Sequence, residues 1–461
     1  MAGGVDRLSD LPDELLLRVL HFVPGKQAAA TTALSRRWRS PLWRSSGAVN
    51  LETDVEDWGY YLYNFNDKSG ESDDALFFSR RDTFVSAAEA ALDAADVPVT
   101  RLTLRVTGHN SIDFFLNGDR HVKLLSSSSR RQGALAKLLS HRAARRVEEL
   151  RLDAHDAYSD EQTGLSSLGL YMFDLGSVQS ENLRVLDLTN CRKLVPPVTG
   201  VVFPRLSSLR LHHGTVRLHA LQSLIYAAPT LVTVHFESLI ISPPTATDRE
   251  SGSWWESCKT PTLPPAEALL RLPAATVLVL DSCNWKDKDG WRYHYTARRH
   301  YIEDKAGVVP VEIDAPKLRR FRYKGIIRPF SLSPRPPDLA HADLHFVPRH
   351  KETKEDPCRG EANLETFWRF LHNFTGAKEL KLNINPAEEL SEARRAELLP
   401  AFSILECLEL HGKAAAVAIT GLLRCCAKLR NLRINHTAEQ QCTTTHTIVT
   451  PKTLSRKEVQ C

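Results

Sequence analysis

The stretch that decides the fold runs from Leu183 to Cys191 and reads Leu-Arg-Val-Leu-Asp-Leu-Thr-Asn-Cys. Apolar and polar residues alternate in its centre, and a period of two indicates a short strand with one buried face. The same spacing returns along most of the chain. Its further copies are Leu102 and Leu104; Val147, Leu150 and Leu152; Leu206, Leu209 and Leu211; Leu231, Val234 and Phe236; Ala275, Leu278 and Leu280; Leu318, Phe321 and Tyr323; Leu339, Ala342 and Leu344; Ala377, Leu380 and Leu382; Leu405, Leu408 and Leu410; and Leu429, Leu432 and Ile434.

The distances between these copies indicate the type of repeat. Several neighbours lie about 21 to 28 residues apart, which is the range of leucine-rich repeats. Other gaps reach about 36 to 48 residues and hold loop-like segments. We therefore expect an α/β fold in which residues 99–436 form an irregular leucine-rich-repeat solenoid with a parallel concave sheet. The stretch 437–461 is polar and aperiodic, which predicts a disordered tail.

A separate pattern occupies the N-terminus, where Leu11-Pro12-Asp13-Glu14-Leu15-Leu16 predicts the start of a helix. Proline suits a first helical position, and acidic residues in the first turn suit the helix dipole. The apolar residues that follow at helical spacing are Leu15, Leu16, Val19, Leu20 and Val23. A second helix from about Gln27 would place Leu34, Trp38 and Leu42 on one side.

Two or three short helices cannot bury so many large side chains among themselves. Some apolar surface must therefore meet another body. Two interpretations remain open from the pattern alone: the leucines complete the core of the neighbouring domain, or they bind a separate protein.

The run from Asp6-Arg7-Leu8 through Leu11-Pro12 to Leu34-Ser35-Arg36-Arg37-Trp38 and Leu42-Trp43 resembles a plant F-box. With the repeats behind it, the chain is similar to plant F-box/leucine-rich-repeat proteins. The resemblance implies an F-box at 1–46, a linker with a helix at 47–98, and a Skp-type adaptor that joins the chain to a cullin scaffold. The residues that it places on the adaptor face are Leu11, Pro12, Leu15, Leu16, Leu20, Leu34 and Trp38.

Composition limits the other possibilities. The 461 residues carry 60 Lys and Arg against 55 Asp and Glu, and this formal charge of +5 is too dilute to indicate nucleic-acid binding. Nine cysteines without a Cys-x-x-Cys pair indicate reduced thiols, and we expect the nucleus or the cytoplasm. The sequence contains neither a signal peptide nor an apolar run of about 18 residues, so we expect no membrane role.

The polar residues of two repeats suggest a binding surface. The stretch 320–324 would present Arg320, Arg322 and Lys324 on one face, and the stretch 341–345 would present His341, Asp343 and His345. We expect a cationic patch that binds an acidic or phosphorylated segment of a protein substrate. A solvated face without a ligand is the alternative, and a metal site on the second triplet is a distant third, so we expect no metal.

The sequence lacks the phosphate-binding and hydrolase motifs by which autonomous enzymes are commonly recognised. We therefore expect no catalytic residue and no cofactor. The expected function is that of a substrate-recognition subunit of an SCF-type ubiquitin ligase. The alternative is a protein-binding scaffold of leucine-rich repeats without ligase activity.

Overall fold

The computed structural model describes residues 11–33, 42–55, 70–108, 111–118, 133–156, 170–196, 200–242, 268–285, 310–347, 365–383, 401–411, 422–435 and 446–449. The chain divides into two compact units, one comprising residues 1–216 with 223–231 and the other residues 217–222 with 232–461. Both units have an α/β character, and each contains a parallel sheet. Within the described residues, no helix combines the length and the apolar character that crossing a bilayer requires.

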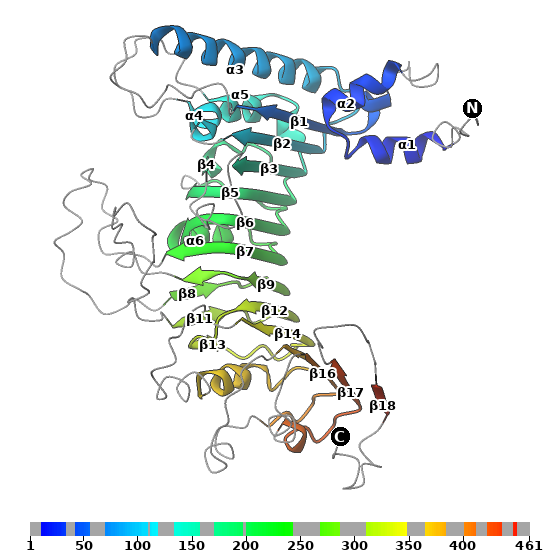
Figure 1. The fold of residues 1–461 in the computed structure, drawn as a ribbon, viewed down its shortest axis with the longest axis vertical. Helices are drawn as coiled ribbons and strands as arrows, with labels where there is room; N and C mark the ends of the chain where they lie inside the picture. The colour runs from blue at the N-terminus through cyan, green and yellow to red at the C-terminus, as the bar shows by residue number, and fades with distance from the viewer. Residues whose placement is uncertain are drawn as a thin grey trace, which may run out of the picture. The chain divides into compact units, whose positions relative to one another are not determined.

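The first unit begins with two short helices and continues into a sheet (Figure 1). Its helical elements are α1 (Asp13–Leu20), α2 (Gly25–Ala30), η1 (Thr31–Ala33), η2 (Leu42–Ser45), α3 (Gly70–Asp93), α4 (Ile112–Asn117), α5 (Ala134–Ser140), η5 (Ala144–Arg146) and η7 (Leu175–Ser177). Its strands are β1 (Ala48–Asp54), β2 (Arg101–Gly108), β3 (Glu149–Asp156), β4 (Tyr171–Asp174), β5 (Val185–Val195) and β6 (Ser208–Arg217). The chain passes to the second unit at α6 (Leu218–Ala227).

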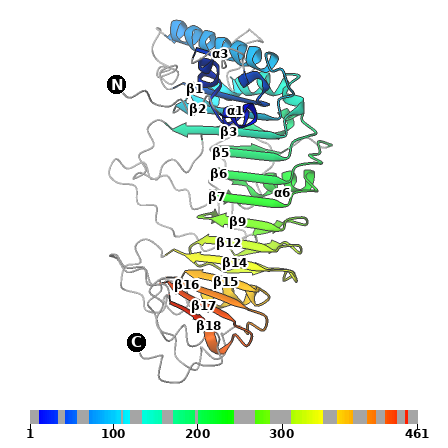
Figure 2. The ribbon, with the colours of Figure 1, turned by 90° about the vertical axis from the view of Figure 1, so that its right-hand side faces the viewer.

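Strands β1, β2, β3, β5 and β6 pair in this order and all run parallel, as Figure 2 shows for their stacking. The register places the predicted apolar pairs directly beside one another. Leu104, Leu152, Leu188 and Leu211 form one such row, and each is at most 3% exposed. Helix α3 lies along β1 and packs on α5, and its buried residues include Val85, Ala88 and Leu92.

The second unit repeats this arrangement with more strands. Its strands are β7 (Thr233–Ser242), β8 (Ala268–Arg271), β9 (Val277–Asp281), β10 (Asn284–Trp285), β11 (Val311–Asp314), β12 (Arg320–Gly325), β13 (Phe330–Leu332), β14 (His341–Phe346), β15 (Glu379–Asn383), β16 (Cys407–His411), β17 (Asn431–Asn435) and β18 (His446–Val449). A short helix at 365–371 leads into η10 (His372–Phe374). The order β7, β9, β12, β14, β15, β16, β17 is parallel throughout, and β13, β11 and β8 form a second, parallel sheet.

The core of the second unit follows the same rows. Phe236, Leu280, Tyr323, Leu344 and Leu382 stand side by side and are at most 3% exposed. A group of aromatic rings extends this core beneath β12, with neighbouring centroids 4.7 to 6.5 Å apart. Its members are Phe321, Tyr323, Phe330, Phe346, Phe370 and Phe374. The predicted inward pairs are therefore the residues that hold the strands together.

Several strands have a non-glycine residue with a positive φ angle at the same register position. Asn190 and His213 have positive φ angles of 61° and 53°, and they follow the paired residues Thr189 and His212. Left-handed backbone is rare for residues other than glycine and marks a local bend. Gly214 comes next with φ of 117°, where an added Cβ would lie 2.1 Å from the backbone oxygen of Cys191. Only glycine allows β6 to pass this close to β5.

One prediction needs correction at the C-terminal end. Strand β18 pairs antiparallel with β17, with Asn431 opposite Val449. The tail predicted to be disordered therefore contains four residues of regular strand, because the free edge of β17 supplies the backbone partners that they need. The rest of 437–461 lies outside the described residues.

Candidate functional site: an apolar ridge and a charged sheet face

Helix α1 begins where the sequence predicts and has two different apolar sides. The backbone oxygen of Pro12 accepts hydrogen bonds from the N–H groups of Leu15 and Leu16 at 3.0 and 3.1 Å, which starts the first turn. Leu16 and Leu20 point into the protein and are 0% and 3% exposed. They form a small core with Ala28 of α2, and the partly buried side chains packed around it are Leu11, Val23, Leu42 and Trp43.

The neighbouring side of α1 is exposed to solvent. Leu15 is 46% exposed, Val19 is 48% exposed and Phe22, just beyond the helix, is 61% exposed. Their spacing of four and three residues places them on one face of a helical turn. We call these three residues the apolar ridge. Large apolar side chains that cluster on a surface mark an interaction site more often than isolated ones do.

The ridge is attached to the sheet at its Phe22 end. The guanidinium carbon of Arg101, on β2, lies 4.6 Å from the centre of the Phe22 ring, which is a cation–π distance. Arg101 is itself largely buried, and this burial is the main reason why its pKa is lowered. The turn that carries Phe22 is also bonded to β1, because Asn50 donates to the backbone oxygens of His21 and Val23.

The predicted adaptor residues separate into three groups in the structure. Pro12 and Leu15 are exposed, as an adaptor face requires, and Leu11 is partly buried. The placement of Leu16 and Leu20 on that face is wrong, because both fill the core between α1 and α2. Leu34 and Trp38 lie outside the described residues. Phe22 was missed, although its distance of seven residues from Leu15 is a helical signal.

The six predicted substrate residues do share one face of the second unit. Register places Arg320 beside His341, Arg322 beside Asp343, and Lys324 beside His345. The residues between them are buried, so these six side chains project away from the core. Their neighbours on β9 and β15, however, include Asp281 and Glu379 in the same rows. The surface is therefore of mixed charge, and the prediction of a cationic patch is wrong in this respect.

The balance of charge extends along the whole face. We call the outward positions of β7, β9, β12, β14, β15, β16 and β17 the charged strip. Its five cations match five carboxylates, and it also holds four histidines. The cations are Arg320, Arg322, Lys324, Lys381 and Arg433; the carboxylates are Glu237, Asp281, Asp343, Glu379 and Glu409; the histidines are His235, His341, His345 and His411.

Each carboxylate of the strip has a basic partner within 4 Å. Lys324 Nζ lies 3.2 Å from a carboxylate oxygen of Asp281, and Arg322 Nε lies 3.7 Å from one of Asp343. The other pairs are His341 with Glu379 at 3.1 Å, His235 with Glu237 at 3.8 Å, and Glu409 with His411 at 2.6 Å and Lys381 at 3.6 Å. Three of these pairs, Lys324 with Asp281, Arg322 with Asp343 and Lys381 with Glu409, join opposite charges on neighbouring strands, which stabilises a sheet.

The pKa values of His345 and Glu409 in the strip differ from their ordinary values. Burial lowers the pKa of His345, with the Lys324 charge acting in the same direction and the Asp343 charge opposing it. Burial works to raise the pKa of Glu409, but the hydrogen bond with His411 and nearby positive charges outweigh it, so that this pKa is lowered. At neutral pH Glu409 therefore stays charged.

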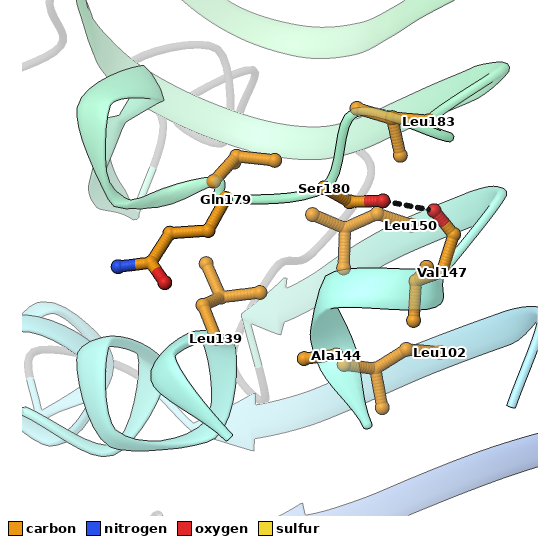
Figure 3. Close-up of a pocket in the computed structure, with 9 residues that line it drawn as sticks. Leu102, Leu139, Ala144, Val147, Leu150, Gln179, Ser180 and Leu183 are labelled. Carbon is orange, nitrogen blue, oxygen red and sulfur yellow. Dashed lines mark hydrogen bonds between the residues drawn. The ribbon is translucent and has the colours of Figure 1, made fainter. Parts of the chain in front are cut away.

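The described residues hold no metal-binding cluster, and a small cavity lies in the first unit. No group of three or more His, Cys, Asp or Glu side chains there is arranged to hold a metal ion. One small cavity in the first unit, shown in Figure 3, has a volume of about 10 Å³ between Leu139, Leu150 and Leu183. The hydroxyl of Ser180 donates to the backbone oxygen of Val147 at its rim, at 2.6 Å. This volume is at the lower limit for a single water molecule.

Comparison with known proteins identifies the N-terminal segment. Residues 8–40 match the F-box domain family. A putative FBD-associated F-box protein of Arabidopsis thaliana is 60% identical over 48 residues, which are 10% of this chain and 25% of that protein. Two F-box/FBD/LRR-repeat proteins of Arabidopsis thaliana are 49% identical over 55 residues and 44% identical over 64 residues. These matches cover 12% and 14% of this chain, and 12% and 13% of the two relatives.

The matched segments thus span at most a quarter of these curated relatives. The matched domain contains α1 and α2, which carry the apolar ridge and the small core beneath it. Behind it lie parallel strands with leucine-type spacing. Residues 8–40 form an F-box domain, and over 12% to 14% of its length the chain is similar to two plant F-box/FBD/LRR-repeat proteins.

Proposed function

We propose that this protein is a substrate-recognition subunit of an SCF-type ubiquitin ligase. Its F-box would bind a Skp-type adaptor and, through it, a cullin scaffold. The apolar ridge is the observation that carries the proposal, because Leu15, Val19 and Phe22 are about half exposed or more beside a core that is already filled. Such a ridge is stabilised when a partner covers it.

The chain's own part in ubiquitin transfer would be geometric. A bound substrate would be held near the conjugating enzyme, which raises the effective concentration of its lysine side chains. This requires no catalytic residue in the chain, and the chemistry would belong to other subunits. We expect the complex to work in the nucleus or the cytoplasm.

We further propose that residues 99–436 belong to an irregular leucine-rich-repeat solenoid with a parallel concave sheet. The recurring apolar rows and the parallel pairing within each unit support this arrangement. The proposed substrate-binding residues are Arg320, Arg322, Lys324, His341, Asp343 and His345 of the charged strip. Because their charges are balanced by neighbours, we expect a protein segment that presents both signs, in preference to a purely acidic or phosphorylated one.

Capture of a purified Skp-type adaptor by the full-length chain tests the adaptor half of the proposal. We expect Leu15→Asp and Val19→Asp to lower adaptor affinity at least about a hundredfold, since a charge would be desolvated in an apolar contact. Val202→Asp is a matched control, because Val202 is an exposed valine (52%) far from α1 in sequence. It should leave capture unchanged.

If the wild-type chain fails to bind the adaptor, the ligase proposal is wrong and the scaffold alternative takes its place. One observation favours that alternative: Leu16 and Leu20 are used internally, which leaves a ridge of only three large side chains among the described residues. Proximity labelling in cells with and without proteasome inhibition separates the two functions further. A ligase substrate should accumulate next to the chain only when degradation is blocked.

A further inference from the structure

Asn50 is a polar residue at the buried beginning of β1. It is 8% exposed and follows Val49, which is also buried. Its Nδ2 lies 3.0 Å from the backbone oxygen of His21 and 3.0 Å from that of Val23. Both partners are carbonyl groups, which can only accept, so the amide orientation is fixed and both of its N–H groups are used.

The two acceptors belong to the turn between α1 and α2, which lies 27 to 29 residues before Asn50 in the chain. The same turn is held at other points. Nδ1 of His21 donates to the backbone oxygen of Ser46 at 2.9 Å. A Cβ on Gly25 would lie 2.9 Å from the backbone oxygen of Asn50, so glycine lets the turn lie directly against the strand.

Among the described residues, these contacts and the cation–π contact of Arg101 with Phe22 join the turn after α1 to the sheet. The core under α1 has three fully buried members, Leu16, Leu20 and Ala28. Strand β1, in contrast, is paired with β2 over seven residues. Hydrogen bonds to β1 therefore hold the turn in a fixed position relative to the sheet. Phe22 of the ridge is part of that turn. The hydrogen bonds of Asn50 thus join the turn that carries Phe22 directly to β1.

We propose that Asn50 is a positioning residue that fixes the adaptor-binding ridge relative to the sheet and thereby selects which lysines receive ubiquitin. This inference rests on the proposed ligase function. Without the two N–H donors, water can satisfy the carbonyls of the turn, so the helices remain folded but lose their fixed orientation. Asn50 lies under the turn and does not need to touch the adaptor.

The test compares Asn50→Ala and Gly25→Ala with the wild-type chain at full length. Gly25→Ala perturbs the contact between the turn and Asn50 from the side of the turn. It replaces Asn50→Ala in the test if that variant folds poorly. Ser180→Ala is the matched control, since its hydroxyl makes a buried bond to the backbone oxygen of Val147 elsewhere in the same unit. Each protein is examined alone by hydrogen exchange, and then with adaptor, cullin, RING subunit and conjugating enzyme for ubiquitin attached to its own lysines.

We expect both test variants to exchange the amides of residues 21–23 about tenfold faster than the control does. Adaptor affinity should stay within about twofold of wild type, while the share of ubiquitin at individual lysines changes about threefold or more. A merely structural role would change stability without redistributing ubiquitin among lysines. An unchanged lysine pattern, or unchanged exchange at 21–23, would overturn the positioning role.

The two proposals fail in different ways. A wild-type chain that does not bind the adaptor contradicts the ligase function, whatever Asn50 does. Hydrogen exchange at the amides of residues 21–23 is measured on the chain alone. It therefore tests the hydrogen bonds of Asn50 even if the adaptor does not bind. If these amides exchange equally fast in Asn50→Ala and Ser180→Ala, then Asn50 does not hold the turn and the inference is wrong.

Discussion

Leu15 and Leu16 are adjacent in sequence, but the structure assigns them opposite roles, which a pair of alanine substitutions can test. Leu16 is fully buried in the core with Leu20 and Ala28. Leu-to-Ala changes in cores cost about 2 to 5 kcal/mol, and we expect about 2 to 3 kcal/mol here because the partly exposed neighbours can move inward. Leu15 is 46% exposed, so Leu15→Ala should cost about 1 kcal/mol or less.

Hydrogen exchange at the amides of α1 measures this difference locally. A loss of 2 to 3 kcal/mol corresponds to exchange about 30- to 150-fold faster for Leu16→Ala, and 1 kcal/mol to about fivefold for Leu15→Ala. Adaptor affinity should show the reverse order when it is corrected for the folded fraction. If both variants accelerate exchange equally, or Leu15→Ala does so more, the division of α1 into a core side and a contact side is wrong.

Three further predictions concern the sheet and its surface. Gly214→Ala should lower stability by at least about 2 kcal/mol in denaturant titration, because the new Cβ would meet the oxygen of Cys191; Gly200→Ala, also at positive φ but with no atom within 4 Å, should cost less. Burial lowers the pKa of His345 below its ordinary 6.5, so the unfolded chain takes up a proton at a higher pH than the folded chain does. The free energy of unfolding should therefore fall as the pH drops through about 6.5, and it should fall less in His345→Asn. Burial raises the pKa of the Cys283 thiol to about 12, so peptide mapping should find it unalkylated at about pH 8 until the protein unfolds.

The repeat strands could be predicted from sequence because their signal is local. Leu186 and Leu188, or Leu408 and Leu410, lie two residues apart, and this period places both on the same side of a strand without knowledge of any partner. Parallel pairing then follows from stacking equivalent copies. Strand β18 carries no such apolar pair, and its position follows from the free edge of β17, which local pattern does not reveal.

The division of the F-box helix could not be predicted in this way. Leu15, Leu16, Val19 and Leu20 together cover more than one face of α1, and a wide apolar stripe does not say which half points inward. That choice depends on Ala28, whose small side chain lets α2 approach Leu16 and Leu20. Asn50 gave no usable signal either, since its partners are backbone oxygens from a turn far away in sequence.

The charge of the charged strip could not be predicted from sequence for a related reason. Arg322 and Lys324 are visible as a basic group in the sequence, but the carboxylates that pair with them come from other strands, Asp343 on β14 and Asp281 on β9. Charge on a sheet face is a property of rows across strands, and the loops between repeats separate the members of a row by tens of residues. Arg322 and Lys324 therefore form a basic cluster in the sequence, but in the folded chain carboxylates from neighbouring strands pair with them.

This neutralisation constrains how the face can recognise a partner. Fields from adjacent opposite charges cancel within a few ångströms, well inside the screening length of about 8 Å at physiological salt, so the strip exerts little long-range attraction on a charged protein. A partner has to come into contact before it can exchange its own charges for the existing pairs, such as Lys324 with Asp281. A purely acidic segment would gain the cations but would meet the carboxylates of the same rows at equally short range. A segment with both signs in matching order avoids that repulsion, and the charged strip would thus discriminate by the pattern of charge rather than by its total.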